Sequence, residues 1–332
     1  MHSRQCSQQT NNRDNTGWET EMDAKDKTRG GLGDWLGLIR FSHTIFALPF
    51  AALATAMAFC GPLPDGGYPT FRWRDLVGIL LCMVFARSAA MAFNRLVDAD
   101  IDADNPRTAK RHVPAGILSR RAVWGFTLVC SVAFIASTAF FLPNVVPLLA
   151  SLPVLVFLCG YSLAKRFTSA AHLWLGIALS LSPLCAWVAI RGPESILNPA
   201  DLVAPLILAA AVAAWVTGFD IIYACQDAEY DTNVGLNSIP AKFGVAGALK
   251  ISAGCHGVML VLLACLPLFA KSVGFGWLFW AALGLIAVLV IRQHSLVKPG
   301  DLDRVNQAFF DMNAAISVAL LVVGVIDCYW VN

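Results

Sequence analysis

The sequence predicts an all-α integral membrane protein with nine transmembrane helices in one bundle. Apolar residues make up 57% of the 332 residues and charged residues 14%, against roughly 45–50% and about 25% in soluble proteins. The mean hydropathy of +0.63 points the same way. From Trp35 onward, apolar segments recur that are long enough to cross a bilayer, which takes about 20 residues. We therefore expect most of the apolar surface to face lipid.

The first 34 residues differ from the rest of the chain. They carry eleven charged residues and no apolar run, so they are predicted to be a disordered polar tail. No apolar segment of the kind a secretory signal needs occurs before Trp35. Residues 35–332 are predicted to form one membrane domain. Its nine predicted helices are 35–60, 76–97, 121–142, 144–164, 171–190, 202–225, 245–269, 273–295 and 308–330.

Charge and cysteine usage exclude several other classes. A net charge of +2 gives no broad basic surface for nucleic acid. The ten cysteines include no C-x-x-C pair, and most lie in apolar runs, where a buried thiol behaves as a small hydrophobe. We therefore expect neither a disulfide framework nor a structural zinc site.

The distribution of Lys and Arg predicts the orientation in the membrane. With the N-terminus inside, nineteen of the 24 basic residues belong to the inner side and Arg87 lies within a helix. The four that remain on the outer side are Arg72, Arg74, Arg191 and Lys271. Because cytoplasmic loops carry the excess of Lys and Arg, the N-terminus is predicted to be cytoplasmic.

Acidic residues concentrate in two short segments. Eight of the 22 Asp and Glu residues lie in the first acidic segment, 94–104, and the second acidic segment, 220–231. Each segment stands at the predicted cytoplasmic end of a helix. The two can therefore face each other across one cavity, although Asp98 and Asp227 are 129 residues apart in the sequence.

Helical geometry places the side chains of each segment on one face. At about 100° per residue, three polar residues of the first segment lie within about 80° and three of the second within about 40°. The two sets are Asn94, Asp98 and Asp102, and Asp220, Asp227 and Asp231. Carboxylates gathered in this way repel one another unless a cation lies between them. Oxygen ligands suit Mg²⁺, which uses one or two carboxylates and then substrate phosphates.

Basic residues follow the first acidic segment directly. Arg107, Lys110 and Arg111 could bind phosphate oxygens that a metal leaves free. A solvated helix face is the alternative for either segment alone. The occurrence of two segments on the same side, each ending a membrane helix, favours a metal–phosphate site.

The two segments resemble the motifs of the UbiA superfamily of intramembrane aromatic prenyltransferases. The first is similar to N-x-x-x-D-x-x-x-D and the second to D-x-x-x-D. Arg40-Phe-Ser-His43-Thr with Phe46-Ala-Leu-Pro49-Phe resembles the family's first helix, and Tyr161-Ser-Leu-Ala-Lys165-Arg166 resembles its Y-x-x-x-K-R segment. The resemblance covers about residues 35–330. Within the superfamily, 90–94 and 218–223 look like the bacterial 4-hydroxybenzoate polyprenyltransferase-like branch.

The resemblance implies a nine-helix bundle with a cytoplasmic cap of short helices and loops, which binds a polyprenyl diphosphate with its tail among the helices. It implies Mg²⁺ as cofactor, and catalytic roles for Asp98, Asp227 and Asp220. The implied metal ligands are Asn94, Asp98, Asp102, Asp227 and Asp231. The implied diphosphate-binding residues are Arg107, Lys110, Arg111, Lys165 and Arg166. Departure of diphosphate leaves an allylic cation, which an activated phenol ring attacks through carbon.

Two charged residues lie deeper in the predicted helices. Arg87 and Asp220 precede Asn94 and Asp227 by seven residues, so they share those faces about 10 Å further in. A charge inside a spanning helix costs about 2.5–3.5 kcal/mol. Either the two neutralise each other, or they hold the carboxylate and the phenol of an aromatic acceptor.

Four further residues have two interpretations each. Arg40 and His43 are candidate acceptor-binding residues, with an interfacial polar contact as the alternative. Lys165 and Arg166 are either diphosphate contacts or topology signals alone.

The function favoured by the sequence is transfer of a polyprenyl chain from its diphosphate to 4-hydroxybenzoate in quinone biosynthesis. The predicted location is the cell inner membrane, with the lipid bilayer and the two substrates as partners and no obligate protein partner indicated. The same chemistry on a hydroxynaphthoate, in menaquinone biosynthesis, is an alternative. A membrane transporter is the alternative from another class, because intramembrane charges also mark ion pathways.

Overall fold

The structure is a computed structural model that describes residues 30–39, 47–271 and 273–331. Over these ranges the chain is helical, and its only β-type pairing is a single bridge between Lys298 and Asp301. The bundle helices are α3 (Leu48–Cys60), α4 (Trp73–Val97), α6 (Arg120–Ser137), α7 (Val146–Ala164), α8 (Ala171–Arg191), α10 (Val203–Ala224), α12 (Ile239–Phe269), α13 (Trp277–Ser295) and α14 (Val305–Ile326). The short elements are α2 (Leu32–Leu38), α5 (Ala99–Asp104), η2 (Thr138–Phe141), α9 (Glu194–Leu197), η3 (Cys225–Asp227), α11 (Ala228–Asn233) and η4 (Asp327–Val331).

The predicted all-α membrane bundle is confirmed. Eight helices of the described chain are long and apolar enough to cross a membrane, and α3 is a shorter apolar helix. With α3 included, the bundle helices follow the order of the nine predicted segments. The first segment, 35–60, differs most, because α2 ends at Leu38 and α3 begins at Leu48. Pro49 stands in the first turn of α3, where a proline favours the start of a helix.

The start of α12 has a physical explanation in its sequence. The side chain of Ser238 accepts a hydrogen bond from the N–H of Ala241 and so caps the helix. Gly244 then has φ +68° and interrupts the helical backbone, a conformation that glycine adopts without steric cost. The long apolar part of α12 therefore begins at residue 245, as the sequence predicts.

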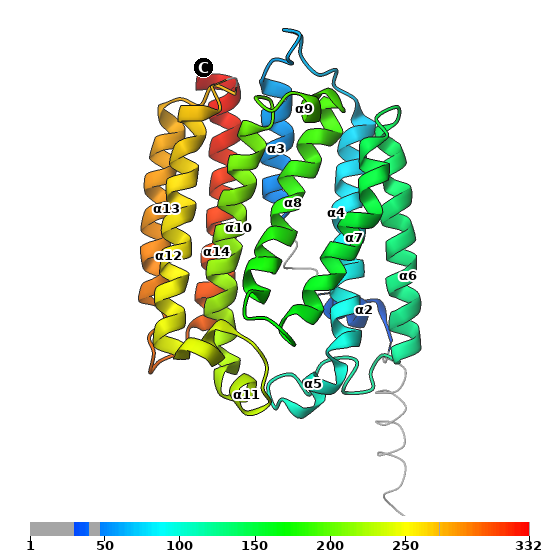
Figure 1. The fold of residues 1–332 in the computed structure, drawn as a ribbon, viewed down its shortest axis with the longest axis vertical. Helices are drawn as coiled ribbons and strands as arrows, with labels where there is room; N and C mark the ends of the chain where they lie inside the picture. The colour runs from blue at the N-terminus through cyan, green and yellow to red at the C-terminus, as the bar shows by residue number, and fades with distance from the viewer. Residues whose placement is uncertain (1–29, 40–46, 272, 332) are drawn as a thin grey trace, which may run out of the picture.

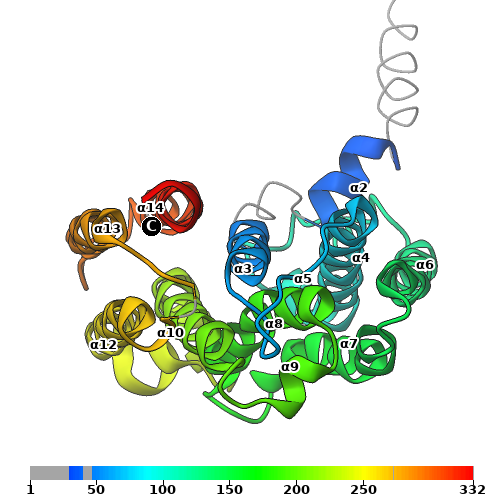
Figure 2. The same cartoon turned by 90° about the horizontal axis from the view of Figure 1, so that it is seen from above.

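The helices form a bundle with two distinct ends. Seen from above, α12, α13 and α14 lie on one side, α4, α6 and α7 on the other, and α8, α10 and α3 between them (Figure 2). The short helices α5 and α11 lie at one end, the cap end, and α9 and the C-terminus lie at the other (Figure 1). The two acidic segments thus come to the same end of the molecule.

The core is centred on α10, whose side chains are buried along most of its length. Trp215 packs against Phe50 of α3 and against Phe219, with ring centroids 5.0 and 4.9 Å apart. Large apolar residues on the outer helices are exposed instead, for example Val129 on α6, Leu149 on α7 and Ile291 on α13. Apolar surface of this extent suits a lipid environment rather than water.

The end opposite the cap is held by a buried ion pair. Arg191, at the end of α8, binds Asp201 with N–O distances of 2.9 and 2.5 Å, and its side chain is 1% exposed. It also donates to the carbonyl oxygen of Ala58 in the last turn of α3 and to those of Gly61 and Pro62 just after it. One guanidinium therefore joins the ends of α3 and α8 to the loop before α10.

Candidate active site

A polar cavity of about 280 Å³ lies at the cap end of the bundle, among α4, α7, α8 and α10. It is lined by oxygen-donor and basic side chains of the kinds predicted for a metal–phosphate site. The acidic and amide residues are Asn94, Asp98, Asp220, Asp227, Asp231 and Asn237, and the basic residues are Arg87, Arg95, Arg111, Lys165 and His172. The sequence prediction that the two acidic segments face one cavity therefore agrees with the geometry.

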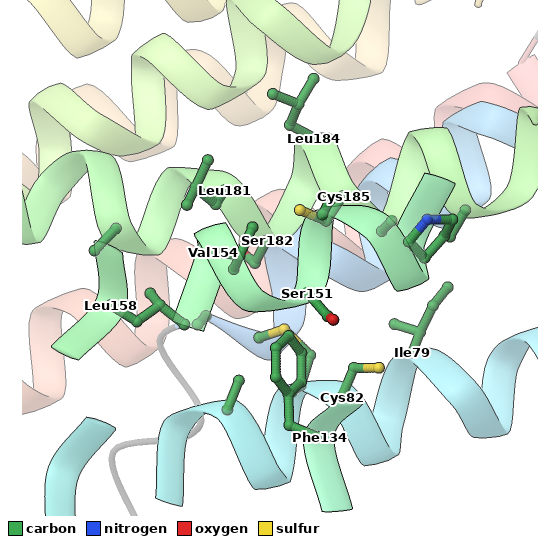
Figure 3. Close-up of a pocket in the computed structure, with 18 of the residues that line it drawn as sticks. Ile79, Cys82, Phe134, Ser151, Val154, Leu158, Leu181, Ser182, Leu184 and Cys185 are labelled. Atoms are coloured by element: carbon green, nitrogen blue, oxygen red, sulfur yellow. The ribbon is translucent and has the colours of Figure 1, made fainter. Parts of the chain in front are cut away.

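A second cavity of about 400 Å³ continues from the first into the bundle. The two share the lining residues Arg87, Met91, Tyr161, Leu175 and Leu179. Figure 3 shows that the deeper cavity is apolar, with Ile79 and Cys82 on α4, Phe134 on α6, Val154 and Leu158 on α7, and Leu181, Ser182 and Cys185 on α8. Its lining residues on α8 span 175–189, about 20 Å along the helix. The space suits an extended hydrocarbon chain with its polar end in the first cavity.

The first wall of the polar cavity is formed where α4 ends. Asp98 directly follows the last residue of α4, and its side chain is 4% exposed. Its carboxylate accepts a hydrogen bond from the amide of Asn94 at 3.0 Å and pairs with Lys165 at 3.1 Å. Arg166 lies 3.4 Å from the same carboxylate and donates to the carbonyl oxygen of Val97 at 2.6 Å. Two cations from the end of α7 thus neutralise this wall.

Asp102 does not line the polar cavity, although it shares the predicted motif. The helix is interrupted at Asp98, and α5 begins at Ala99, so the regular stripe of the motif is broken. Asp102 is buried, and Nη1 of Arg111 lies 2.7 and 2.8 Å from its two carboxylate oxygens. Arg95 lies 3.8 Å away. In this structure Asp102 fixes Arg111, which itself lines the cavity.

The second wall is formed where α10 passes into η3 and α11. Arg107 donates from Nε and Nη2 to the two oxygens of Asp227, and Asn105 donates to the same carboxylate at 3.1 Å. Arg107 also donates to the hydroxyl of Tyr223 at 3.2 Å. Burial acts to lower the pKa of Arg107, but the hydrogen bonds and charge of Asp227 outweigh it and raise that pKa. Arg107 therefore remains a cation.

The two walls are tied together across the cap. Tyr230 of α11 donates a hydrogen bond to the carbonyl oxygen of Ile101 in α5 at 2.9 Å. The N–H of Asn237, after α11, donates to the carbonyl oxygen of Lys165 at 2.7 Å. The ion pair of Arg107 with Asp227 adds a third link between the segments. The cap is thus a connected structure and not two separate loops.

Asp220 lines the polar cavity from within α10, whereas Asp227 lies beyond the end of that helix, in η3. Its partner is His172 in the first turn of α8, with Nδ1 of His172 2.7 Å from Oδ2 of Asp220. Arg87 lines both cavities at the point where they meet. Asp220 is therefore hydrogen-bonded to His172, and both Arg87 and Asp220 contribute to the wall of the polar cavity.

The remaining predicted residues are placed as follows. Lys110 is exposed and does not line the polar cavity, whereas Lys165 and Arg111 line it. Arg40 and His43 lie outside the described residues. Asp100 is paired with exposed Arg120 on the surface of the cap, and the hydrogen bond from Arg120 lowers the pKa of Asp100.

The oxygen-donor set fits a Mg²⁺ ion that is shared with a substrate. Among the described residues, no three His, Cys, Asp or Glu side chains already converge on one point. Asn94 and Asp98 on one wall face Asp227 and Asp231 on the other, and all four offer oxygen atoms. Mg²⁺ binds through one or two carboxylates together with water and phosphate oxygens. Two ligands on each wall meet that requirement.

Sequence reasoning missed His172. It lies 48 residues from Asp220 in the chain, and nothing in the local pattern joins the two. The available signal was a single titratable residue near the start of the apolar segment predicted at 171–190. The contributions of Asn105 and Tyr223 were missed for the same reason, since both act through Arg107 and Asp227.

Comparisons with known proteins agree with this geometry. The chain matches the model of the UbiA prenyltransferase family over residues 47–316. It is 31% identical over 244 residues to the 4-hydroxybenzoate octaprenyltransferase of Nitrosomonas eutropha, covering 72% of this chain and 79% of that protein. It is 30% identical over 242 residues to the protein of the same name from Methylobacillus flagellatus, covering 72% and 77%.

Solved structures show the same similarity. A UbiA homolog from Aeropyrum pernix has a TM-score of 0.73 and 32% identity, covering 86% of this chain and 97% of that one. A UbiA homolog from Archaeoglobus fulgidus, solved with DMAPP and Mg²⁺ bound, has a TM-score of 0.67 over 88% of this chain and 97% of that one. At 19% identity, the similarity to this second structure shows a shared fold only. Sequence and fold thus lead to the same group of proteins.

Proposed function

The chain belongs to the UbiA prenyltransferase family, and we propose that it transfers a polyprenyl chain from polyprenyl diphosphate to the ring of 4-hydroxybenzoate. As a family member it is a prenyltransferase with a multi-pass membrane fold. The benzoate acceptor, the use in quinone biosynthesis and the roles of individual residues belong to the proposal. Family membership favours a transferase over the membrane transporter considered above.

One observation carries the proposal. The polar cavity, with Asn94 and Asp98 facing Asp227 and Asp231, leads directly into the apolar cavity between α4, α7 and α8. A diphosphate requires cations and an isoprenoid tail requires hydrocarbon, and the two cavities offer these side by side. An aromatic acceptor then finds space at the junction, beside Arg87 and Asp220.

The metal would be Mg²⁺, held by Asn94, Asp98, Asp227 and Asp231. Asp102 is left out of this ligand set because it does not line the polar cavity. Its carboxylate instead holds Arg111, which does line it. When bound, Mg²⁺ supplies positive charge that stabilises the departing diphosphate. The relative from Archaeoglobus, solved with DMAPP and Mg²⁺, supports a divalent cation as cofactor.

The basic side chains in and beside the polar cavity have a role of their own. Lys165 and Arg111 line it, whereas Arg107 and Arg166 bind its carboxylates without lining it. Lys165 and Arg166 at Asp98, and Arg107 at Asp227, are held at the walls by carboxylates. Arg111 is held in the same way by Asp102. Phosphate oxygens can take these donors, because a guanidinium binds a phosphate in the same forked geometry as a carboxylate. The four residues would therefore hold the diphosphate as its bond to the prenyl carbon breaks.

Ring attack completes the reaction. The C–O bond of the prenyl diphosphate breaks, diphosphate leaves with the electron pair, and an allylic cation remains. The acceptor ring attacks through carbon to form a C–C bond and then loses its ring proton. Asp220 would orient or deprotonate the phenol, and Arg87 would bind the carboxylate of the acceptor. The apolar wall formed by Leu175 and Leu179 excludes water, which would quench the cation.

An enzyme assay tests the proposal directly. Membranes that contain the protein are incubated with labelled polyprenyl diphosphates of several lengths and with 4-hydroxybenzoate or a hydroxynaphthoate. We expect transfer of label to the benzoate in the presence of Mg²⁺. Transfer to the naphthoate alone would place the protein on a menaquinone route, and absence of transfer to any aromatic acid would refute the aromatic acceptor.

Replacing Arg87 by leucine tests the acceptor site. We expect the KM for 4-hydroxybenzoate to rise roughly tenfold to hundredfold, because a hydrogen bond to a charged group contributes about 1.5–3 kcal/mol. The KM for polyprenyl diphosphate should change little. Arg121→Leu, on the exposed face of α6, serves as the control. A larger effect on the diphosphate KM than on the acceptor KM would assign Arg87 to the other substrate.

The proposed orientation places the cap on the cytoplasmic side of the inner membrane. In a cysteine-free variant, we expect Ala103→Cys and Thr232→Cys, both exposed on the cap, to react with an impermeant maleimide only after the cells are opened. Asp65→Cys, on the loop between α3 and α4, should react in intact cells. Labelling of the cap positions in intact cells would reverse the orientation.

A further inference from the structure

His172 is a buried titratable residue that the mechanism above does not use. It lies in the first turn of α8, is 5% exposed, and contacts the carboxylate of Asp220 on α10. We propose that His172 is a positioning residue, which holds Asp220 in the orientation that receives the phenol of the acceptor. This inference rests on the proposed function, in which Asp220 acts on the acceptor.

The hydrogen bonds of His172 assign its proton. Its Nε2 lies 3.3 Å from the backbone nitrogen of Ile239, and a backbone N–H can only donate. Nε2 is therefore the acceptor, and the ring proton is on Nδ1. Nδ1 then donates to Oδ2 of Asp220 across 2.7 Å. The tautomer is thus assigned from the hydrogen-bond pattern.

The partner on the other side of His172 is a helix end. Ile239 is the first residue of α12, and the first N–H groups of a helix have no partner within it. The imidazole satisfies one of them and is fixed by it. The resulting chain of contacts runs from the N-terminus of α12 through His172 to Asp220, and it joins three helices.

This arrangement leaves Asp220 able to act. One carboxylate oxygen is held by His172, while 24% of the side chain is exposed and lines the polar cavity. A side chain held on one side by a locked donor has a restricted set of rotamers, as a catalytic group requires. His172 therefore acts through Asp220 and needs no contact with the substrate.

The segment just before α12 also contacts the first wall of the polar cavity. Asn237, two residues before Ile239, donates its N–H to the carbonyl oxygen of Lys165. Lys165 in turn pairs with Asp98. Residues 237–239 thus contact both Lys165 at the first wall and His172, the residue that positions Asp220.

Three variants separate positioning from packing. His172→Phe keeps a ring of similar size and removes both hydrogen bonds. His172→Asn places an amide N–H near the position of Nδ1 and keeps a donor for Asp220. Leu173→Ala is the control, because this neighbour on the same turn is 48% exposed.

Purified protein is assayed with 4-hydroxybenzoate and polyprenyl diphosphate. For His172→Phe we expect kcat to fall roughly tenfold to hundredfold, the usual cost of losing an orienting partner, with the KM for the diphosphate unchanged within about twofold. His172→Asn should recover most of kcat. The proposal is overturned if His172→Phe keeps the wild-type kcat. It is also overturned if His172→Asn folds but has a kcat as low as that of His172→Phe.

An infrared difference measurement tests the contact without any substrate. Subtracting the spectrum of Asp220→Asn from that of the wild type isolates the carboxylate band of Asp220. We expect this band to shift in His172→Phe and to return towards its wild-type position in His172→Asn. An unchanged band in His172→Phe overturns the inference even if transfer to 4-hydroxybenzoate is observed. A shifted band without any transfer leaves the contact established and refutes the proposed function instead.

Discussion

Replacing Asp98 by asparagine is expected to remove nearly all turnover while the protein still inserts into the membrane. The change removes a carboxylate charge from the wall that Asn94 shares, and with it a proposed ligand of Mg²⁺. A bound metal contributes several kcal/mol to stabilising transition-state charge, so we expect kcat to fall by at least about 100-fold. Asp227→Asn should have a similar effect from the opposite wall. Initial rates of prenyl transfer at saturating substrate measure both.

The controls for this prediction lie on the two short helices that directly follow Asp98 and Asp227. Asp100→Asn on α5 and Glu229→Gln on α11 remove the same charge at exposed positions outside the polar cavity. Both should keep turnover close to that of the wild type. EDTA should abolish wild-type activity, and added Mg²⁺ should restore it. Full activity in EDTA, or equal losses in the controls, would falsify the assignment of a metal to these carboxylates.

Replacing Arg191 by methionine is expected to cause the largest loss of stability of any change considered. The substitution leaves Asp201 buried without its ion-pair partner and three backbone carbonyls without their donor. Breaking a buried ion pair by removing one partner costs about 3–5 kcal/mol. We expect the free energy of unfolding in detergent to fall by that amount, measured by denaturant titration of tryptophan fluorescence.

The same experiment separates stability from activity. Arg191 lies at the end of the bundle opposite the polar cavity, so the KM values of the variant that remains folded should match the wild type. Arg74→Met is the matched control, because Arg74 is exposed at the same end and donates a single hydrogen bond, to Leu142. Arg74→Met should lower the free energy of unfolding by less than about 1 kcal/mol. Equal losses of unfolding free energy in the two variants would show that the buried contacts of Arg191 stabilise the protein no more than the exposed hydrogen bond of Arg74.

The fold was predictable because the signal for it is local. A helix that crosses the membrane must be apolar along most of its length, whether it faces lipid or other helices, so the segments at 202–225 and 273–295 could be located without knowledge of their neighbours. Where the predicted and the observed helices differ, the cause is a local change in the backbone. The break at Asp98 between α4 and α5 is an example, since the sequence continues with helix-compatible residues.

The candidate site was predictable only in part, because its partnerships are long-range. The two acidic segments could be paired from their common side, and Asp98 and Asp227 do line one cavity. Which donor binds which carboxylate could not be predicted. Arg107 pairs with Asp227 across 120 residues, and His172 with Asp220 across 48. Such contacts depend on how the helices pack and leave no periodic trace in the sequence.

The position of Arg166 has a consequence for the electrostatics of the helices. Arg166 donates to the carbonyl oxygen of Val97, the last residue of α4, and lies beside Asp98. A helix C-terminus carries a partial negative charge, so a carboxylate placed there opposes the helix macrodipole. Arg166 compensates both the dipole and the carboxylate, and Lys165 adds to this. Lys165 and Arg166 therefore stabilise the end of α4, and under the proposed function a change at either residue would weaken both that helix end and diphosphate binding. If these side chains also bind diphosphate as proposed, selection for activity and selection for stability would act on the same residues and restrict how far this part of the chain can vary.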